Sequence, residues 1–283
     1  MDHLEPTPDD HDGGLRLDLP RFIGRRRALQ FLGVSGVAVL VGCGSNGDGG
    51  TASATTSSST TSTTNGSTTT AAAAACSEIP EETAGPYPGD GSNGPNVLTE
   101  SGVVRSDITS SFGSSTTVAE GVPLTIVLDL VDTANGCQPL AGGAVYVWHC
   151  DREGRYSMYG QGVEGENYLR GVQESDGDGV VTFTSIFPAA YSGRWPHIHF
   201  EVHPSLAAAT SAGDPVATSQ LALPEDICNE VYATSGYEQS VRNLAQTSLT
   251  RDMVFGDDGA AHQLATIEGT AATAVAARLT VPV

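Results

Sequence analysis

The chain has 283 residues, with 33 acidic and 13 basic side chains, and its formal net charge is −20. Every basic residue is arginine and no lysine occurs. Nucleic-acid binding needs clustered cations that neutralise phosphates, so this charge balance excludes a nucleic-acid partner. The part that follows residue 75 is roughly 200 residues long, which suffices for one domain with a substantial core.

Residues 1–42 have the pattern of an export signal. Arg25–Arg27 precede an apolar run that ends at Val41, and this run is shorter than the about 20 apolar residues that span a bilayer. The paired arginines with Leu29 two positions on resemble a twin-arginine signal. The run ends in L-V-G-C, which resembles a bacterial lipobox. We expect a Tat-type lipoprotein signal peptide with Cys43 lipidated; the alternative is simple cleavage, with Cys43 incidental.

Residues 43–75 consist mainly of Gly, Ser, Thr, Asn and Ala. A segment without periodicity or apolar bulk cannot offset its own ordering entropy, so we expect a flexible tether. Together with the signal, it predicts an exported, extracytoplasmic protein held at the cell surface by lipid. That N-terminal anchor is the only membrane contact that the sequence predicts.

Four further cysteines lie in the expected catalytic domain, residues 76–283. An even number outside the cytoplasm suggests two disulfides, and four residues allow three connectivities. No C-x-x-C pair occurs, which argues against a thiolate metal site. The disulfide candidates are Cys76, Cys137, Cys150 and Cys228.

Alternating apolar residues predict the strands of this domain. The run from Val122 to Leu130 alternates as a strand with one buried face does. The run from Ala144 to Cys150 is apolar on both faces, as in a central strand of a sandwich. Further strands are expected at residues 179–187, 194–203 and 218–223.

Turn-forming residues separate these strands. Asp176-Gly177-Asp178-Gly179 fits a tight hairpin turn, and it lacks the further ligands of a calcium loop. No helical period is convincing before Glu225, and short helical turns are expected between Ile227 and Leu249. Short strands with Gly- and Pro-rich connections predict an all-β antiparallel sandwich with long loops.

The segment from Tyr191 to Val202 is the most informative part of the chain. Residues two apart on a strand project to the same face, so His197 and His199 stand side by side. The opposite face carries only apolar side chains. Neutral imidazole is a common metal ligand, so the pair is suited to hold a metal. Exposed strand histidines are the alternative.

The two histidines leave the metal and its other ligands open. Zinc or iron(II) would favour Glu201 or His203 from the same face. Iron(III) would favour phenolate oxygen, because a strongly Lewis-acidic ion can ionise a tyrosine whose free pKa is about 10. The candidate tyrosines are Tyr156 and Tyr191, with Tyr159 and Tyr168 as competitors for the place of Tyr156.

Six short motifs occur in order along residues 76–260. They are E-E-T-A-G-P-Y-P (81–88), V-Y-V-W-H-C-D-R-E-G-R-Y-S (145–157), N-Y-L-R-G-V-Q (167–173), D-G-x-G-x-x-x-F-T-x-I-x-P (176–188), Y-S-G-R-W-P-H-I-H (191–199) and T-S-Q-L (218–221). In this combination the chain resembles the intradiol ring-cleavage dioxygenases, which include catechol 1,2-dioxygenase and protocatechuate 3,4-dioxygenase. The resemblance is greatest to their secreted bacterial branch.

The resemblance implies a prealbumin-like β-sandwich and a non-haem Fe(3+) enzyme without an organic cofactor. Such an enzyme cleaves a catechol-type ring between its two hydroxyls with O2 and gives a cis,cis-muconate-type diacid. The resemblance leaves open whether the protein forms a homo-oligomer. The iron ligands implied by the resemblance are Tyr156, Tyr191, His197 and His199.

The resemblance also implies roles for the residues around the metal. Tyr191 would be the ligand that substrate displaces, and it could take a substrate proton. Arg194 would stabilise negative charge that builds on the ring. Gln220 would line the substrate pocket and Tyr87 would border it.

Two other functions compete with this assignment. A non-catalytic, surface-tethered β-sandwich that binds carbohydrate or protein would suit the anchor and tether equally well. It would have no reason to assemble two tyrosines, two histidines and one arginine. A zinc or iron(II) hydrolase or oxygenase would instead use His197, His199 and Glu201. His149 is expected to be structural, and His203 to lie just past the site.

Overall fold

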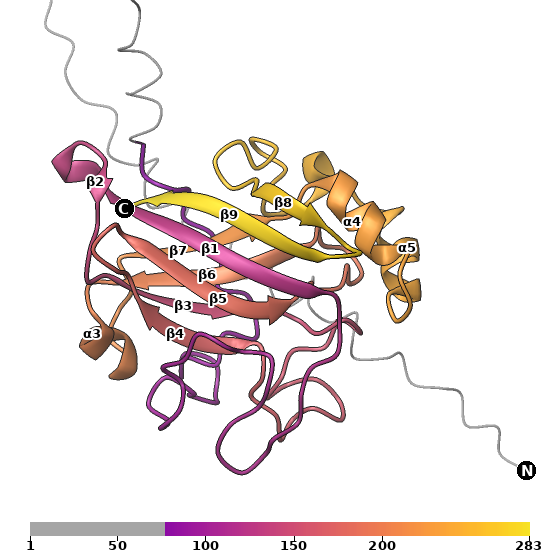
Figure 1. The fold of residues 1–283 in the computed structure, drawn as a ribbon, viewed down its shortest axis with the longest axis horizontal. Coiled ribbons are helices and arrows are strands. Elements are labelled where there is room, and N and C mark those ends of the chain that lie inside the picture. The colour runs from indigo at the N-terminus through magenta and orange to yellow at the C-terminus, as the bar shows by residue number, and fades with distance from the viewer. Residues whose placement is uncertain (1–76) are drawn as a thin grey trace, which may run out of the picture.

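The computed structural model describes residues 77–283, which form two β-sheets packed face to face (Figure 1). One sheet has the strand order β2-β1-β9-β8, with β5 also paired to β1, and the other has the order β4-β3-β6-β7. The strands are β1 (Pro123–Asp132), β2 (Gln138–Pro139), β3 (Ala144–Trp148), β4 (Arg170–Glu174), β5 (Val180–Ile186), β6 (His197–His203), β7 (Ala217–Ala222), β8 (Thr266–Thr270) and β9 (Ala274–Pro282).

Short helical segments fill the connections. Helices α4 and α5 lie together at one end of the sandwich, at the right of Figure 1. None of the helices within residues 77–283 is both long enough and apolar enough to cross a membrane. The helical segments are η3 (Thr133–Asn135), α3 (Leu206–Thr210), α4 (Glu225–Tyr232), α5 (Glu238–Leu244) and η4 (Leu249–Arg251).

The main core lies between the two sheets. The alternate residues of β1 that were predicted to be buried are buried, and they pack with the inward residues of β5 and β9. The second sheet contributes Val145 and Val147 of β3 and the apolar face of β6. Removing such side chains from water stabilises the fold by about 25 cal/mol per Å² of apolar surface. The all-β sandwich is therefore confirmed.

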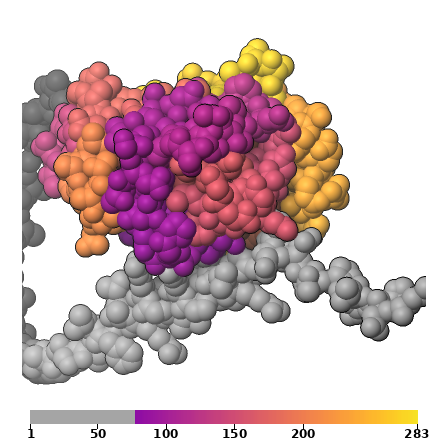
Figure 2. Space-filling view, turned by 90° about the horizontal axis from the view of Figure 1, so that it is seen from below, coloured from indigo at the N-terminus to yellow at the C-terminus, as the bar shows by residue number. Residues whose placement is uncertain are grey.

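A second apolar cluster covers the outer face of the four-stranded sheet. Tyr146 and Trp148 of β3 point away from the main core and pack with Val97, Leu98 and Tyr156 from the loops. Both faces of β3 are thus buried, as its sequence predicts. In Figure 2 the indigo-to-purple N-terminal part of the described chain wraps around salmon-coloured residues on one face. Segments from the N-terminal part of the described chain therefore cover the outer face of this sheet.

Several details differ from the sequence prediction. β4, β8, β9 and the one-turn helix α3 were not predicted, and β9 pairs with β1 in parallel. The turn at Asp176–Gly179 forms, with Asp176 Oδ1 accepting from the backbone of Asp178 and Val180. It is not a hairpin turn, because β4 and β5 belong to different sheets.

The prediction that the four cysteines of the domain form two disulfides is wrong. Cys150 and Cys228 are free and buried, whereas Cys137 is disulfide-bonded. Burial raises the pKa of both free thiols, so each stays protonated as a small apolar group. The predicted signal peptide (1–42), the tether (43–75), Cys43 and Cys76 lie outside the described residues.

Candidate metal centre

Strand β6 places the two histidines. Ile198, Phe200 and Val202 enter the main core, so His197 and His199 point to the outer face of the sheet. Strand pairing sets His199 between Trp148 of β3 and Gln220 of β7. The indole of Trp148 stacks on the His199 ring, with centroids 4.9 Å apart and planes at 7°. The strand begins at His197, three residues later than predicted.

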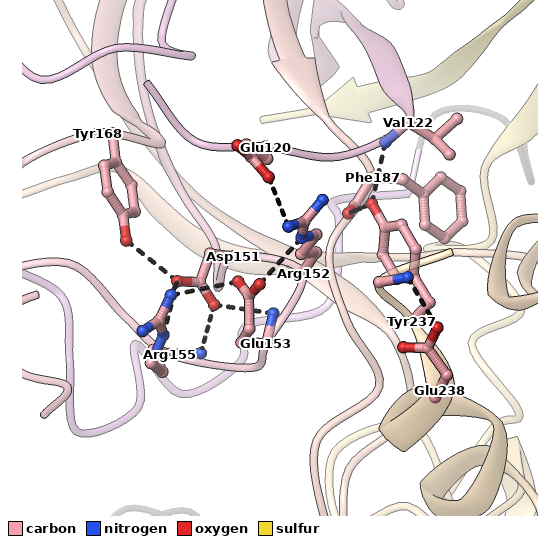
Figure 3. Close-up of polar contacts among 11 residues, drawn as sticks. Glu120, Val122, Asp151, Arg152, Glu153, Arg155, Tyr168, Phe187, Tyr237 and Glu238 are labelled. Carbon is pink, nitrogen blue, oxygen red and sulfur yellow. Dashed lines mark hydrogen bonds and ion pairs between the residues drawn. The ribbon is translucent and has the colours of Figure 1, made fainter. Parts of the chain in front are cut away.

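A tight turn built around Asp151, whose contacts are drawn in Figure 3, comes directly before the first tyrosine, Tyr156. The buried Asp151 carboxylate accepts hydrogen bonds from the backbone of Glu153 and Arg155, from Arg155 Nε and from the Tyr168 hydroxyl. The Asp151 N–H donates to the Arg155 carbonyl at 2.8 Å, which closes the turn. The next residue, Tyr156, therefore leaves the turn in one fixed direction.

Tyr191 is held against this turn. The backbone N–H of Ala189 donates to the Asp151 carbonyl, and a Cβ at Gly154 would lie 3.2 Å from the Tyr191 Cβ. From the other side, Ser240 and Asn243 of α5 hydrogen-bond to the backbone of Ala190. The two tyrosines thus come from loops that share backbone contacts.

The four predicted ligands meet at one place. Tyr191 Oη lies 3.2 Å from His197 Nε2, and Tyr156 Oη lies 3.5 Å from both of these atoms. His199 Nε2 lies 3.1 Å from His197 Nε2. Tyr156 and both histidines are buried, whereas Tyr191 is half-buried. Two oxygens and two nitrogens therefore converge from three separate segments.

Burial keeps both imidazoles neutral. It lowers the pKa of His197 and His199 well below the usual value, and the Arg194 charge lowers both further. His197 Nδ1 lies 2.5 Å from the Trp195 carbonyl. A carbonyl only accepts, so Nδ1 carries the proton and the Nε2 lone pair faces the other three groups. A neutral imidazole with this tautomer can bind a metal.

The phenol of Tyr156 cannot ionise readily by itself. Burial raises its pKa well above the usual value, and the neighbouring Tyr191 and Cys150 raise it further. A bound cation would reverse this by stabilising the phenolate. Two phenol oxygens beside two neutral imidazoles form a donor set that suits Fe(3+), and the residues present fit that ion.

The N-terminal segment closes over the site. Gly85 has φ +70, and a Cβ there would lie 3.3 Å from His199 Cε1. Only glycine allows this backbone conformation and this approach without strain. Tyr87 packs its ring on Tyr156, with centroids 5.2 Å apart. Tyr87 therefore lies beside one of the four converging groups, and its place at the border of a substrate pocket stays a prediction.

Arg194 is buried beside the site, and the Nε–Nη2 edge of its guanidinium is hydrogen-bonded within the protein. Its Nε donates to Asp252 at 3.0 Å, and its Nη2 donates to Gln220 Oε1 at 2.7 Å. Gln220 Nε2 donates to the Thr83 carbonyl. Both ends of the Gln220 amide are thus used by the protein, so direct substrate binding by Gln220 stays a prediction.

The competing residues lie elsewhere. Tyr159 Oη accepts from the Gly89 N–H and Tyr168 Oη donates to Asp151, so neither joins the cluster. Glu201 approaches His203 at 3.6 Å. Residues 77–283 contain no group of three or more His, Cys, Asp or Glu side chains arranged to hold a metal. A site of His197, His199 and Glu201 therefore finds no support, and a mixed tyrosine–histidine site remains.

Sequence reasoning missed Asp151 and Asp252. Both carboxylates are buried, and each accepts hydrogen bonds that hold a predicted site residue or its loop. Asp151 stands inside the motif of residues 145–157, but Asp252 stands in none of the six motifs. Their partners are fixed by tertiary structure, so the sequence contains no signal for Asp252. His149 is structural as predicted, since it contacts Ser185 Oγ and the Cys150 carbonyl.

Known dioxygenases resemble this chain. A family model described as dioxygenase matches residues 94–198. An intradiol ring-cleavage dioxygenase from Tetranychus urticae is 27% identical, with a TM-score of 0.56, and the match covers 74% of this chain and 96% of that chain. A second dioxygenase of known structure is 26% identical, with a TM-score of 0.57 and coverage of 74% and 96%. No curated protein sequence matches the chain.

Proposed function

We propose that the chain is a member of the intradiol ring-cleavage dioxygenases, to which it is similar, and that it is an iron(III) enzyme that acts on catechols. It cleaves a catechol-type ring between the two hydroxyl-bearing carbons, and both atoms of O2 enter a cis,cis-muconate-type diacid. The observation that carries the proposal is the convergence of two phenol oxygens and two imidazole nitrogens. Each of these four atoms lies within 3.5 Å of at least one of the other three.

The iron would be held by the four converging side chains. When bound, ferric iron supplies Lewis acidity that ionises the catechol hydroxyls and orients the ring. All four oxidising equivalents and both added oxygen atoms come from O2, so no external reductant or organic cofactor is required. The ligands in this proposal are Tyr156, Tyr191, His197 and His199.

Tyr191 is the ligand best suited to leave when substrate binds. Its side chain is half-buried, whereas Tyr156, His197 and His199 are buried. Tyr191 is therefore the most exposed of the four side chains. Once released, its phenolate oxygen can accept a proton from a catechol hydroxyl, which keeps that proton transfer inside the site.

Arg194 provides the positive charge of the site. Asp252 and Gln220 occupy Nε and Nη2, and none of residues 77–283 forms a hydrogen bond with Nη1. That nitrogen can donate to negative charge that develops on the substrate. A buried, preorganised guanidinium stabilises such charge more strongly than one in water.

Colour and oxygen uptake test this function. Purified, iron-loaded protein is expected to be red-brown from tyrosinate-to-iron charge transfer, and to convert catechol to a muconate while consuming one O2 per ring. A zinc site would be colourless. Colourless protein at full iron occupancy would refute the proposal. A panel of catechol, hydroxyquinol and protocatechuate then identifies the substrate.

We also propose that the protein is exported and lipid-anchored through Cys43. The support is the sequence pattern of residues 1–42 and the low-complexity segment 43–75. Cells given a labelled fatty acid are expected to label the wild-type protein but not the Cys43→Ser variant. Equal labelling of both proteins would contradict the anchor.

A further inference from the structure

We propose that Asp252 is a positioning residue. It holds the Arg194 guanidinium and, through Trp195, the imidazole of His197, which is one of the proposed metal ligands. The proposal rests on the proposed function for its catalytic consequence. Asp252 follows η4, far in sequence from the motifs that carry the site. Its carboxylate has no exposed surface, and it lies against Arg194 in a buried ion pair.

The two carboxylate oxygens of Asp252 have different tasks. Oδ1 accepts from the backbone N–H groups of Val254 and Phe255 at 2.9 and 3.2 Å, and at 3.4 Å from Arg194 Nη2. The two backbone bonds fix the carboxylate to its own segment. Oδ2 accepts from Arg194 Nε at 3.0 Å and from the Trp195 N–H at 2.6 Å. Oδ1 therefore anchors the residue and also makes a long contact to Arg194, whereas both bonds of Oδ2 go to Arg194 and Trp195.

The first consequence concerns Arg194. Nε and Nη2 are held by Asp252 and Gln220, so the plane of the guanidinium cannot rotate. A cation that stabilises developing charge must already be oriented when the charge appears. Asp252 supplies that orientation, and it also neutralises a charge that would be costly to bury alone.

The second consequence concerns His197. Trp195 donates its N–H to Asp252, and its carbonyl accepts from His197 Nδ1 at 2.5 Å. The Phe255 ring, carried by the same segment as Asp252, packs edge-on to the His197 ring at 6.4 Å. Asp252 thus fixes the peptide that sets the tautomer and the direction of the imidazole. Groups that orient a metal-binding histidine change metal affinity or activity by about 10- to 100-fold when removed.

The test compares Asp252→Asn with Asp258→Asn. Asn at 252 keeps Oδ1 for Val254 and Phe255, but its NH2 group faces two donors, Arg194 Nε and the Trp195 N–H. Asp258 is exposed on the same segment and accepts from the Ala260 N–H. The control therefore removes the same charge, and it likewise keeps an Oδ1 for its local backbone contact, without touching the site.

The first readout needs neither iron nor turnover. The His197 Nδ1 proton, assigned by its loss in His197→Gln, is expected as a slowly exchanging signal in proton NMR of the wild type. In Asp252→Asn it should exchange at least about tenfold faster, and in Asp258→Asn it should be unchanged. Equal exchange in both variants overturns the link between Asp252 and His197.

The second readout is a double-mutant cycle with Arg194→Ala. With catechol, Asp252→Asn should lower kcat about 10- to 100-fold. If Asp252 acts through Arg194, its substitution costs much less in the Arg194→Ala background. Full additivity overturns this part of the proposal. A wild-type enzyme that binds iron and cleaves no catechol refutes the proposed function instead, and the NMR result still decides whether Asp252 positions His197.

Discussion

The ionisation of Tyr156 is the residue-scale property on which the site depends. Burial and two neighbouring groups raise the pKa of its phenol, so the oxygen is protonated at neutral pH without a cation. Metal binding must therefore displace a proton from this oxygen, and the apparent metal affinity should rise with pH. The same reasoning explains why the sequence alone could not choose among the tyrosines of its motif: each has the same intrinsic pKa.

Substitution of Tyr156 by Phe tests its role directly. The variant keeps the packed ring and loses the oxygen, so most of the tyrosinate-to-iron absorption should disappear. Tyr159→Phe is the matched control, because the Tyr159 ring packs at a tilt against the same Tyr87 ring and its hydroxyl accepts from the Gly89 N–H. A visible spectrum of each iron-loaded protein checks this. Unchanged absorbance in Tyr156→Phe would show that the ligand has been misassigned.

Gly85 offers a second residue-scale prediction. Alanine there must adopt φ +70 and place its Cβ 3.3 Å from His199 Cε1, whereas alanine at Gly142 must adopt φ +79 in open space. In both variants the free energy of unfolding should fall by about 1 kcal/mol. Only Gly85→Ala should also lose iron faster to a chelator, because only it presses on a ligand. Equal iron loss from the two variants would mean that the contact with His199 is unimportant.

Strand β6 shows what sequence can predict at the scale of an element. A period of two sets the histidines on one face and the apolar residues on the other, and the structure confirms this because the pattern is local. The predicted start of the strand, at Arg194, was wrong, because β6 begins at His197. Arg194 and Trp195 are held by Asp252, from a segment more than fifty residues away, and this contact keeps them out of the sheet.

The turn from Asp151 to Arg155 is an element whose stability can be tested. Asp151→Asn removes the buried negative charge that accepts hydrogen bonds from Arg155 Nε and the Tyr168 hydroxyl. The free energy of unfolding should therefore fall by about 2–3 kcal/mol. Glu153→Gln breaks an exposed contact to the same arginine and should cost less than about 0.5 kcal/mol. Denaturant unfolding measures both. Similar losses for the two variants would show that the turn does not depend on Asp151.

At the scale of the whole molecule, the sequence predicted which residues are buried better than it predicted which strands are neighbours. Alternation in β1 identifies its buried face, but nothing in that pattern reveals that β9 lies beside it in parallel. The cysteines illustrate the same limit. An even number suggested pairs, yet Cys150 and Cys228 lie separately in apolar surroundings, each donating to a backbone carbonyl. Both errors concern contacts between distant segments.

The charge of the whole molecule leads to a last prediction. The net charge of −20 repels an anionic catechol such as protocatechuate and leaves neutral catechol unaffected. Salt shortens the range of this repulsion to about 10 Å at 0.1 M. Raising the salt concentration should therefore increase kcat/KM for protocatechuate, chiefly through KM, while kcat/KM for catechol stays constant. Steady-state kinetics at several salt concentrations measure this. A parallel response of both substrates would point to an effect of salt on the enzyme itself and not on the encounter with substrate.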